Sequence, residues 1–184
     1  MQYELTTPCT AQDLAPLRAG DTVLLSGVVY TARDQAHKRM LEALDRGEKL
    51  PFDLEGSAIY YVGPTPERPG EVIGSAGPTT SGRMDAMSPR LLDLGNKVMI
   101  GKGKRDAAVK EAVVRNGAVY LAALGGAGAL MAKSVKTLEV IAWPDLGCEA
   151  VRRLTVEQMP LTVILDAHGG DLYLSGPEAY RASR

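Results

Sequence analysis

The segment 22–30, TVLLSGVVY, constrains the fold most, because a helical pattern follows it almost at once. Its apolar, β-branched residues predict a buried strand. Residues 32–46, ARDQAHKRMLEALDR, place apolar side chains at helical spacing, and Gly47 is a natural helix terminator. Thr31 is expected to cap this helix, with Asp34 three residues later as the acidic member of a capping box. A strand that runs directly into a helix indicates an α/β fold.

The rest of the chain repeats this alternation loosely. We expect strands at 58–62, 71–76, 97–100, 118–124, 138–143 and 161–166, a candidate strand at 171–174, and helices at 84–94, 106–115 and 129–135. Residues 176–184 are expected to form a polar tail. This order favours a mixed sheet with helices over a doubly wound fold. A length of 184 residues suits a single domain, which we assign to residues 1–184.

Composition excludes several classes of partner. The chain has 21 basic and 22 acidic residues and only 5% aromatic residues, which argues against a nucleic-acid partner. No apolar run reaches the roughly 18 residues that a membrane span needs, so no membrane partner is expected. The first ten residues, MQYELTTPCT, lack the pattern of a secretory signal, and we expect a cytoplasmic protein.

The four soft or imidazole ligands are widely separated in the sequence. Cys9, His37, Cys148 and His168 form neither a C-x-x-C nor an H-x-x-x-H pattern. A zinc site or an iron–sulfur cluster needs three or four ligands drawn together. We therefore expect no metal ligand in this chain, and we interpret both cysteines as packing residues.

The predicted helix 32–46 carries two polar residues on its apolar stripe. On a helical wheel of about 100° per residue, Arg33 and His37 lie on the same face as Ala36 and Met40. A cation near a helix N-terminus opposes the helix dipole, and a bound anion would relieve that conflict. The alternative is that Arg33 pairs with Asp34 or with another local carboxylate.

Two further loops carry cations near backbone N–H groups. The run 77–83, GPTTSGR, has three consecutive hydroxyls and ends in Arg83, whose planar guanidinium can grip an anion. Its alternative reading is a helix cap by Thr80 or Ser81 with a solvated arginine. Lys102 stands between two glycines after a short strand, where it could reach a ligand or remain a solvated loop lysine.

Taken together, Arg33, Arg83 and Lys102 are expected at the ends of successive strands, where open α/β sheets bind ligands. Three cations suit a small substrate with two negative groups. Neither a Walker loop nor a G-x-G-x-x-G nucleotide fingerprint is present.

At these residues the sequence resembles a known family. The runs L-S-G-x-x-x-T-A-R-D-x-A-H-K-R (25–39), G-P-T-T-S-G-R-M-D (77–85) and I-G-K-G (100–103) resemble the β subunit of class I fumarate hydratase and L-tartrate dehydratase, which forms the C-terminal domain of single-chain class I fumarases. Gly125-Gly126 and the stretches 146–150 and 166–173 resemble the same family, in the same order.

The resemblance implies a swivelling β/β/α domain and a function in reversible hydration of fumarate to L-malate. It implies a hetero-oligomer with an α subunit that carries a [4Fe–4S] cluster, which this chain would lack. It also implies that Arg33, Thr79, Arg83 and Lys102 bind the dicarboxylate, that Thr79 transfers a proton, and that His37 and Asp34 support catalysis. The alternatives are an L-tartrate dehydratase β subunit and a stand-alone module that binds small anions without catalysis.

Overall fold

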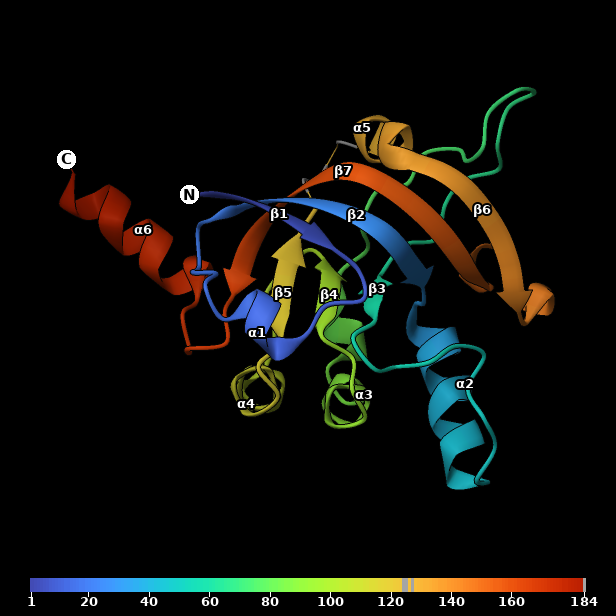
Figure 1. Cartoon of the computed structure of the whole chain (residues 1–184), viewed down its shortest axis with the longest axis horizontal. Coiled ribbons are helices and arrows are strands. Elements are labelled where there is room, and N and C mark those ends of the chain that lie inside the picture. Colours follow the sequence, from blue (N-terminus) through green and yellow to red (C-terminus); the bar gives the residue numbers. More distant parts are fainter. Residues whose placement is uncertain (124–125, 127, 184) are drawn as a thin grey trace.

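The computed structural model describes residues 1–123, 126 and 128–183, and it confirms the predicted α/β class with a mixed sheet (Figure 1). Its strands are β1 (Gln2–Thr6), β2 (Thr22–Thr31), β3 (Ala58–Tyr60), β4 (Val98–Gly101), β5 (Val119–Ala122), β6 (Val135–Ala142) and β7 (Val151–Leu165). Its helices are α1 (Ala11–Leu14), α2 (Asp34–Asp45), α3 (Ser88–Asp93), α4 (Ala107–Arg115), α5 (Gly128–Ser134) and α6 (Leu172–Ala182), with the 3₁₀ helices η1 (Ser81–Met84) and η2 (Pro144–Glu149).

Within the described residues the sheet has seven strands, in the order β1-β2-β3-β4-β5-β7-β6. The first five of these pair in parallel, and β7 runs antiparallel to β5, β6 and β2. Because β7 pairs with β2 as well as β5, the strands β2, β3, β4, β5 and β7 close on themselves. The strands β1 and β6 lie outside this closed part of the sheet.

Alternate residues of the central strands enter two different hydrophobic cores. In β3 and β4, Tyr60 and Ile100 face the core shared with β2 and β7, whereas Ile59 and Met99 face the core shared with the helices. Strands of a parallel sheet that are buried on both faces read as continuous apolar runs, as these do. Because β2, β3 and β4 pair in parallel in this order, their C-terminal ends meet at one edge of the sheet.

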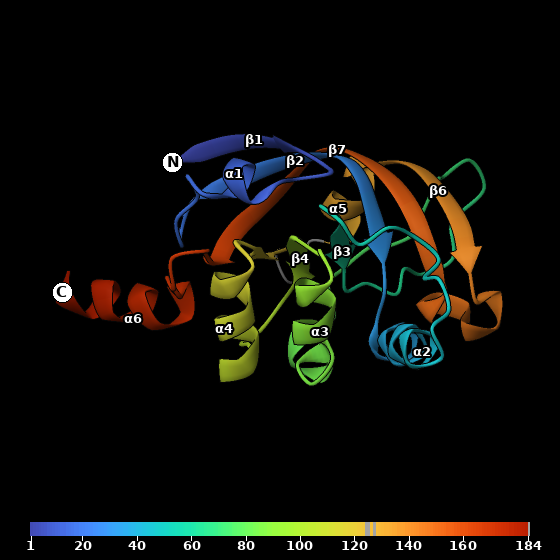
Figure 2. The same ribbon diagram turned by 60° about the horizontal axis from the view of Figure 1, so that its bottom comes forward.

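The helices α2, α3 and α4 cover the core to which Ile59 and Met99 belong. Figures 1 and 2 show α3 and α4 side by side beneath β4 and β5, with α2 beside them below the end of β2. The buried residues of α2 are Ala36, His37, Met40 and Ala43, which is the stripe that the sequence predicts. The helix stops before Gly47, which has a φ of 71°, as expected for a C-terminal glycine.

Several predicted boundaries are wrong. The cap of α2 is Arg33 and not Thr31, because β2 extends to Thr31 and pairs it with Arg152 of β7. Residues 71–76 form an irregular loop, and residues 172–182 form a helix in place of the predicted strand and tail. The predicted strand 118–124 is observed as β5, and Leu124 lies outside the described residues.

The sequence did not predict β1, α1, η2 or the first ten residues of β7, which begins at Val151 instead of Leu161. In the part of the chain that the structure describes, no helix combines the length and the apolar character needed to cross a membrane.

Candidate functional site

The junction between β2 and α2 forms the first part of the candidate site. Arg33 occupies the N-cap position of α2, and Asp34 is its first residue. The Nε atom of Arg33 lies 4.0 Å from Asp34 Oδ1, and Nη1 of Arg83 lies 3.6 Å from the same oxygen. Asp34 thus lies between two guanidinium groups. Its Oδ1 is buried and has no hydrogen-bond partner among the described residues.

The loop that carries Thr79 folds back onto the end of β3. The Thr79 N–H donates to the Tyr61 carbonyl over 2.8 Å, and Arg83 Nη2 donates to Thr79 Oγ1. Thr80 is the N-cap of η1 but makes no side-chain capping bond, so the cap reading does not hold for it. A cation that donates to a hydroxyl oxygen favours its deprotonated form. The Thr79 oxygen is therefore held by Arg83, and its hydroxyl donates to no acceptor among the described residues.

The loop after β4 is docked on this segment. The Ser81 N–H donates to the Lys102 carbonyl over 2.9 Å, and the Lys102 N–H donates to Ser81 Oγ over 3.0 Å. A Cβ atom at position 101 would lie 2.0 Å from Ser81 Oγ, so this close approach requires Gly101. The Lys102 side chain is exposed, and its ammonium makes no ion pair within the described part of the chain.

His37 lies beneath the junction and is buried. Its Nδ1 is 2.9 Å from the Arg33 carbonyl, and its ring meets the edge of Tyr61 at a centroid distance of 5.3 Å. Burial lowers the pKa of His37 to about 4, so the ring is neutral at physiological pH. Its Nε2 is buried and has no partner in the residues described. His37 thus contacts the backbone that carries Arg33.

Two residues of η2 complete the cluster, and neither was assigned to the site from the sequence. Glu149 Oε1 lies 3.3 Å from Arg33 Nη2, and Cys148 Sγ lies 4.0 Å from Arg33 Nη1. The packing interpretation holds for Cys9, which is buried, and is wrong for Cys148, which is exposed. No pattern within 144–149 shows this contact, because it joins residues more than a hundred positions apart.

A buried ion pair supports the site from below. Arg105 donates from Nε to Asp85 Oδ1 over 2.5 Å and from Nη2 to Ser88 Oγ over 2.8 Å. Its guanidinium lies 5.3 Å from the ring of Tyr61 and 5.0 Å from that of Tyr120. Asp85 follows η1 directly, so this network fixes the helix that carries Arg83.

The structure therefore gathers the predicted residues at the ends of β2, β3 and β4. Contacts join Arg33, Asp34, Thr79 and Arg83 directly, and backbone hydrogen bonds place Lys102 beside them. The three cations exceed the two carboxylates, Asp34 and Glu149, by one positive charge (3 − 2 = +1). This edge suits an anionic ligand, which would meet cations and a hydroxyl, whereas the N–H groups of Thr79 and Ser81 already donate to carbonyls of the chain.

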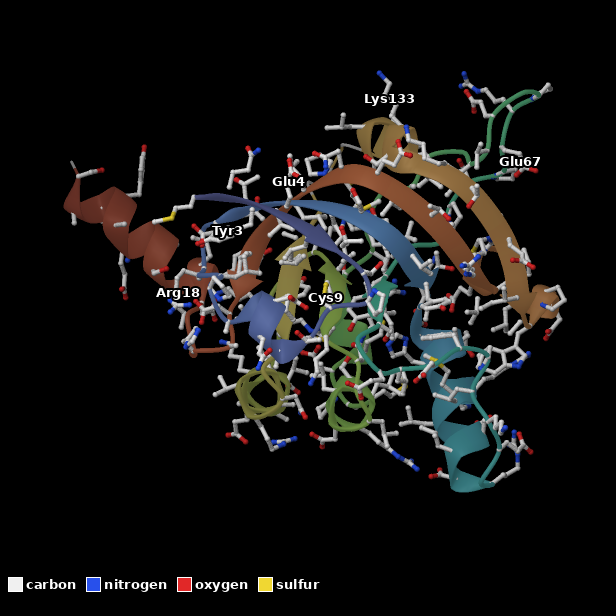
Figure 3. All side chains as sticks on the ribbon, in the orientation of Figure 1. Tyr3, Glu4, Cys9, Arg18, Glu67 and Lys133 are labelled. Atoms are coloured by element: carbon white, nitrogen blue, oxygen red, sulfur yellow. The ribbon has the colours of Figure 1, made fainter. Side chains whose placement is uncertain are left out.

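The cavities do not coincide with this cluster. One, of about 440 Å³, lies between the loop 65–75 and α5, and one of about 480 Å³ lies between α2 and the segment 48–54. Another, of about 450 Å³, is lined by the loop, β6 and η2 and includes Cys148, which also contacts Arg33. Figure 3 shows Glu67 on that loop and Lys133 on α5, on the side of the molecule opposite α3 and α4. Arg83 and Lys102 are exposed, so the candidate site is open to solvent at these residues.

The donor set of this chain does not fit an iron–sulfur cluster, whose ligands are usually four cysteine thiolates. Of the two thiols, Cys9 is buried with its Sγ 3.5 Å from the Thr6 carbonyl, and Cys148 is exposed beside Arg33. Among the described residues, no three His, Cys, Asp or Glu side chains form a group that could hold a metal ion.

Comparison with known proteins gives concordant matches. Residues 1–176 match the family described as Fumarase C-terminus. The putative L(+)-tartrate dehydratase subunit beta of Methanocaldococcus jannaschii is 42% identical over 170 residues, covering 89% of this chain and 87% of that protein. The L(+)-tartrate dehydratase subunit beta of Escherichia coli K12 is 33% identical over 189 residues, covering 100% of this chain and 92% of that protein.

Longer relatives match over part of their length only. Fumarate hydratase 2 of Leishmania major is 39% identical over 168 residues, covering 88% of this chain. The match spans 29% of that protein, and 28% of the class I aerobic fumarate hydratase of Salmonella typhimurium. The chain therefore corresponds in extent to the tartrate dehydratase β subunits and to under a third of these fumarate hydratases.

Proposed function

The chain belongs to the fumarase C-terminus family, and from that premise we propose that it is the β subunit of a hydro-lyase that interconverts fumarate and L-malate. The observation that carries the proposal is the cluster of Arg33, Arg83 and Lys102 around Thr79 at one edge of the sheet. A dicarboxylate brings two negative charges to this edge. Arginine can grip a carboxylate through two parallel hydrogen bonds, and lysine supplies a compact positive charge.

Thr79 is proposed to transfer the proton at the carbon next to a carboxylate. In the hydration direction the Thr79 hydroxyl gives its proton to this carbon, and the hydrogen bond from Arg83 stabilises the alkoxide that remains until the proton released from water replaces it. In the dehydration direction the same alkoxide takes the proton from the carbon. Negative charge also accumulates on the substrate carboxylate as the carbon proton is removed, and the nearby cations stabilise it. Asp34 and His37 are proposed to support this step by holding Arg33 and Arg83.

We assign the remaining chemistry to a partner. Hydroxide is a poor leaving group, since the pKa of water is about 15.7, and a Lewis acid assists its departure. The described residues of this chain do not fit such a group, and we propose that an α subunit carries it as a [4Fe–4S] cluster. The open form of the site supports this division. Both cysteines are free thiols, in keeping with a reducing cytoplasmic compartment.

L-tartrate dehydration is the second candidate function. The observation that favours it is coverage: the chain matches 87% and 92% of the length of two tartrate dehydratase β subunits. Tartrate carries an additional hydroxyl group but the same two carboxylates, so the same cations would bind it.

The test is assembly of the chain with a cluster-bearing α subunit, followed by kinetics on fumarate, L-malate and L-tartrate. Turnover that requires both chains is the expected result, and the ratio of kcat/KM values identifies the substrate. Thr79→Ala should lower kcat by about 10²-fold or more, and Thr79→Ser should restore much of it. Anion binding by the chain alone, with no turnover by any assembled pair, would instead favour a non-catalytic module.

A further inference from the structure

Glu149 contacts two parts of the candidate site at once. Its Oε2 accepts a hydrogen bond from the Gln35 N–H, in the first turn of α2, over 2.9 Å. Its Oε1 lies 3.3 Å from Arg33 Nη2. The Glu149 side chain is only 14% exposed. An internal carboxylate thus fills the position at the start of α2 where the sequence predicts a bound anion.

Arg33 lies in a slot that Gly63 leaves open. A Cβ atom at position 63 would be 2.6 Å from Arg33 Nη1, 3.1 Å from its Cδ and 3.3 Å from the Cys148 carbonyl oxygen. The guanidinium therefore passes between the backbone of Gly63 and the end of η2. Its only other carboxylate contact among the described residues is the 4.0 Å approach to Asp34. Glu149 is the nearer and better placed partner.

We propose that Glu149 is the positioning residue for Arg33, and that it holds the guanidinium in this slot ready to receive a substrate carboxylate. This inference rests on the proposed function. An arginine side chain has many rotamers, and fixing it before the ligand arrives removes that ordering cost from binding. Because the second Glu149 oxygen is bound to the Gln35 N–H, the carboxylate cannot follow a displaced Arg33 without losing a further hydrogen bond.

The competing view is that Glu149 is a rival for the substrate. A carboxylate on Arg33 could occupy the place of the ligand and weaken its binding by repulsion. The two views predict opposite changes in the KM for the substrate when the charge of Glu149 is removed. In Glu149→Gln the amide oxygen can still accept from the Gln35 N–H, but the amide NH₂ then faces Arg33, and two donors cannot pair.

The experiment compares three variants of the chain assembled with its α subunit. We expect Glu149→Gln to raise KM for L-malate and fumarate by roughly tenfold, with kcat lowered less than about threefold. Glu149→Asp keeps the charge on a shorter side chain and should recover part of the loss. Asp145→Asn is the matched control, because Asp145 lies on the same η2 segment and pairs with Arg39, away from Arg33. It should stay within about twofold of wild type.

Two outcomes of these kinetics would overturn the inference. A KM for Glu149→Gln equal to that of Asp145→Asn would show that Glu149 does not act on Arg33. A KM below that of the wild type would show that Glu149 competes with the substrate.

A second measurement does not need turnover. In the isolated chain, a double-mutant cycle of Arg33→Met and Glu149→Gln in urea unfolding should show coupling of about fivefold or more in the unfolding constant. The same cycle for the exposed pair Arg39 and Asp145 should show about twofold or less. If the assembled wild type turns over none of the three substrates, the proposed function fails. Coupling between Arg33 and Glu149 would then still show that Glu149 holds Arg33 in place, and its absence would overturn the inference on its own.

Discussion

The buried Arg105 and the partly exposed pair Arg33 and Arg83 have different surroundings. Arg105 is completely buried, and its Nε, Nη1 and Nη2 atoms contact Asp85, Met99 and Ser88. Arg33 and Arg83 are 20% and 45% exposed, respectively, and both approach Asp34 at 3.6–4.0 Å, beyond the range of a good hydrogen bond. Similar side chains thus form a closed network in one region and an open one in the other.

The closed network around Arg105 supports the fold, whereas the open network around Arg33 and Arg83 is available to a ligand. A buried charge is tolerated only when its donors are paired, and the Arg105 network meets that condition. In the open network, the Nε of Arg33, the Oδ1 of Asp34 and the Nε2 of His37 are buried without a hydrogen-bond partner among the described residues. Unpaired buried polar atoms gather where a ligand or a second chain is expected to supply the missing partners.

Removing Arg105 tests the comparison with the largest expected effect. Arg105→Met should destabilise the isolated chain by about 3–5 kcal/mol, because it leaves the carboxylate of Asp85 without its cation. Arg83→Met, the control from the open network, should cost about 1 kcal/mol or less, because Arg83 is exposed. Urea unfolding of both variants measures the difference. Equal losses of stability would contradict the distinction between the two networks.

The next prediction concerns recognition by Arg83. Arg83→Lys in the assembled enzyme should lower kcat/KM by about 10²-fold, because one ammonium cannot contact Asp34, Thr79 and a substrate carboxylate together. Steady-state kinetics on the preferred substrate measures it. Arg90→Lys, on α3, changes an exposed arginine paired with Asp45 and serves as the control. Wild-type kinetics in Arg83→Lys would show that Arg83 takes no part in the site.

His37 makes stability depend on pH. Burial lowers its pKa from 6.5 to about 4, so the unfolded chain binds the extra proton first as pH falls. The stabilisation is complete above the unfolded pKa and is lost as pH falls toward the folded one. We expect His37 to account for a loss of about 2 kcal/mol between about pH 7 and about pH 5. The free energy of unfolding of His37→Gln, measured in urea at each pH, should fall less steeply between about pH 7 and about pH 5 than that of the wild type. His168→Gln is the control for removing a histidine, and it should keep the wild-type dependence on pH.

The smallest effect is expected at Gly63. In Gly63→Ala the new methyl group would displace the end of the Arg33 side chain, which can move, so the melting temperature should change by no more than about 2 °C. We expect kcat/KM to fall about fivefold, because the guanidinium leaves its slot. Gly176→Ala, whose nearest contact is 3.6 Å away, is the control. A loss of stability without loss of kcat/KM would remove Gly63 from the site.

Local patterns predicted the elements that carry the site, but not the contacts that close it. The strand β2, the buried stripe of α2 and the positions of Arg33 and Lys102 follow from periodicity and from strand order. Arg83 was placed after a strand at 71–76, but the structure has a loop there and places Arg83 on η1. The first part of β7 was missed because polar residues such as Arg152 and Glu157 interrupt its apolar pattern. The helix α6 was missed because it contains Pro177, although Asp171 caps its start by accepting from the Tyr173 N–H.

The site residues show the same division. Arg33 and His37 could be found because their polarity interrupts the apolar stripe that Ala36 and Met40 form. Glu149 could not be found, since its contacts with Arg33 and Gln35 depend on how β7 brings η2 against α2. The burial of Arg105 likewise depends on tertiary structure, because its neighbours in the sequence, Lys104 and Asp106, are exposed. Long-range pairing, and not residue type, decided both roles.

The position of β7 has a consequence for the growing chain on the ribosome. This strand is synthesised after all the other strands, yet it supplies the antiparallel partner of β2, β5 and β6. Until residue 165 has left the exit tunnel, the facing edges of β2 and β5 have no partner and can pair with other nascent chains. The closed part of the sheet, formed by β2, β3, β4, β5 and β7, is therefore completed late. We expect a prematurely terminated product that ends before Val151 to aggregate or to be degraded.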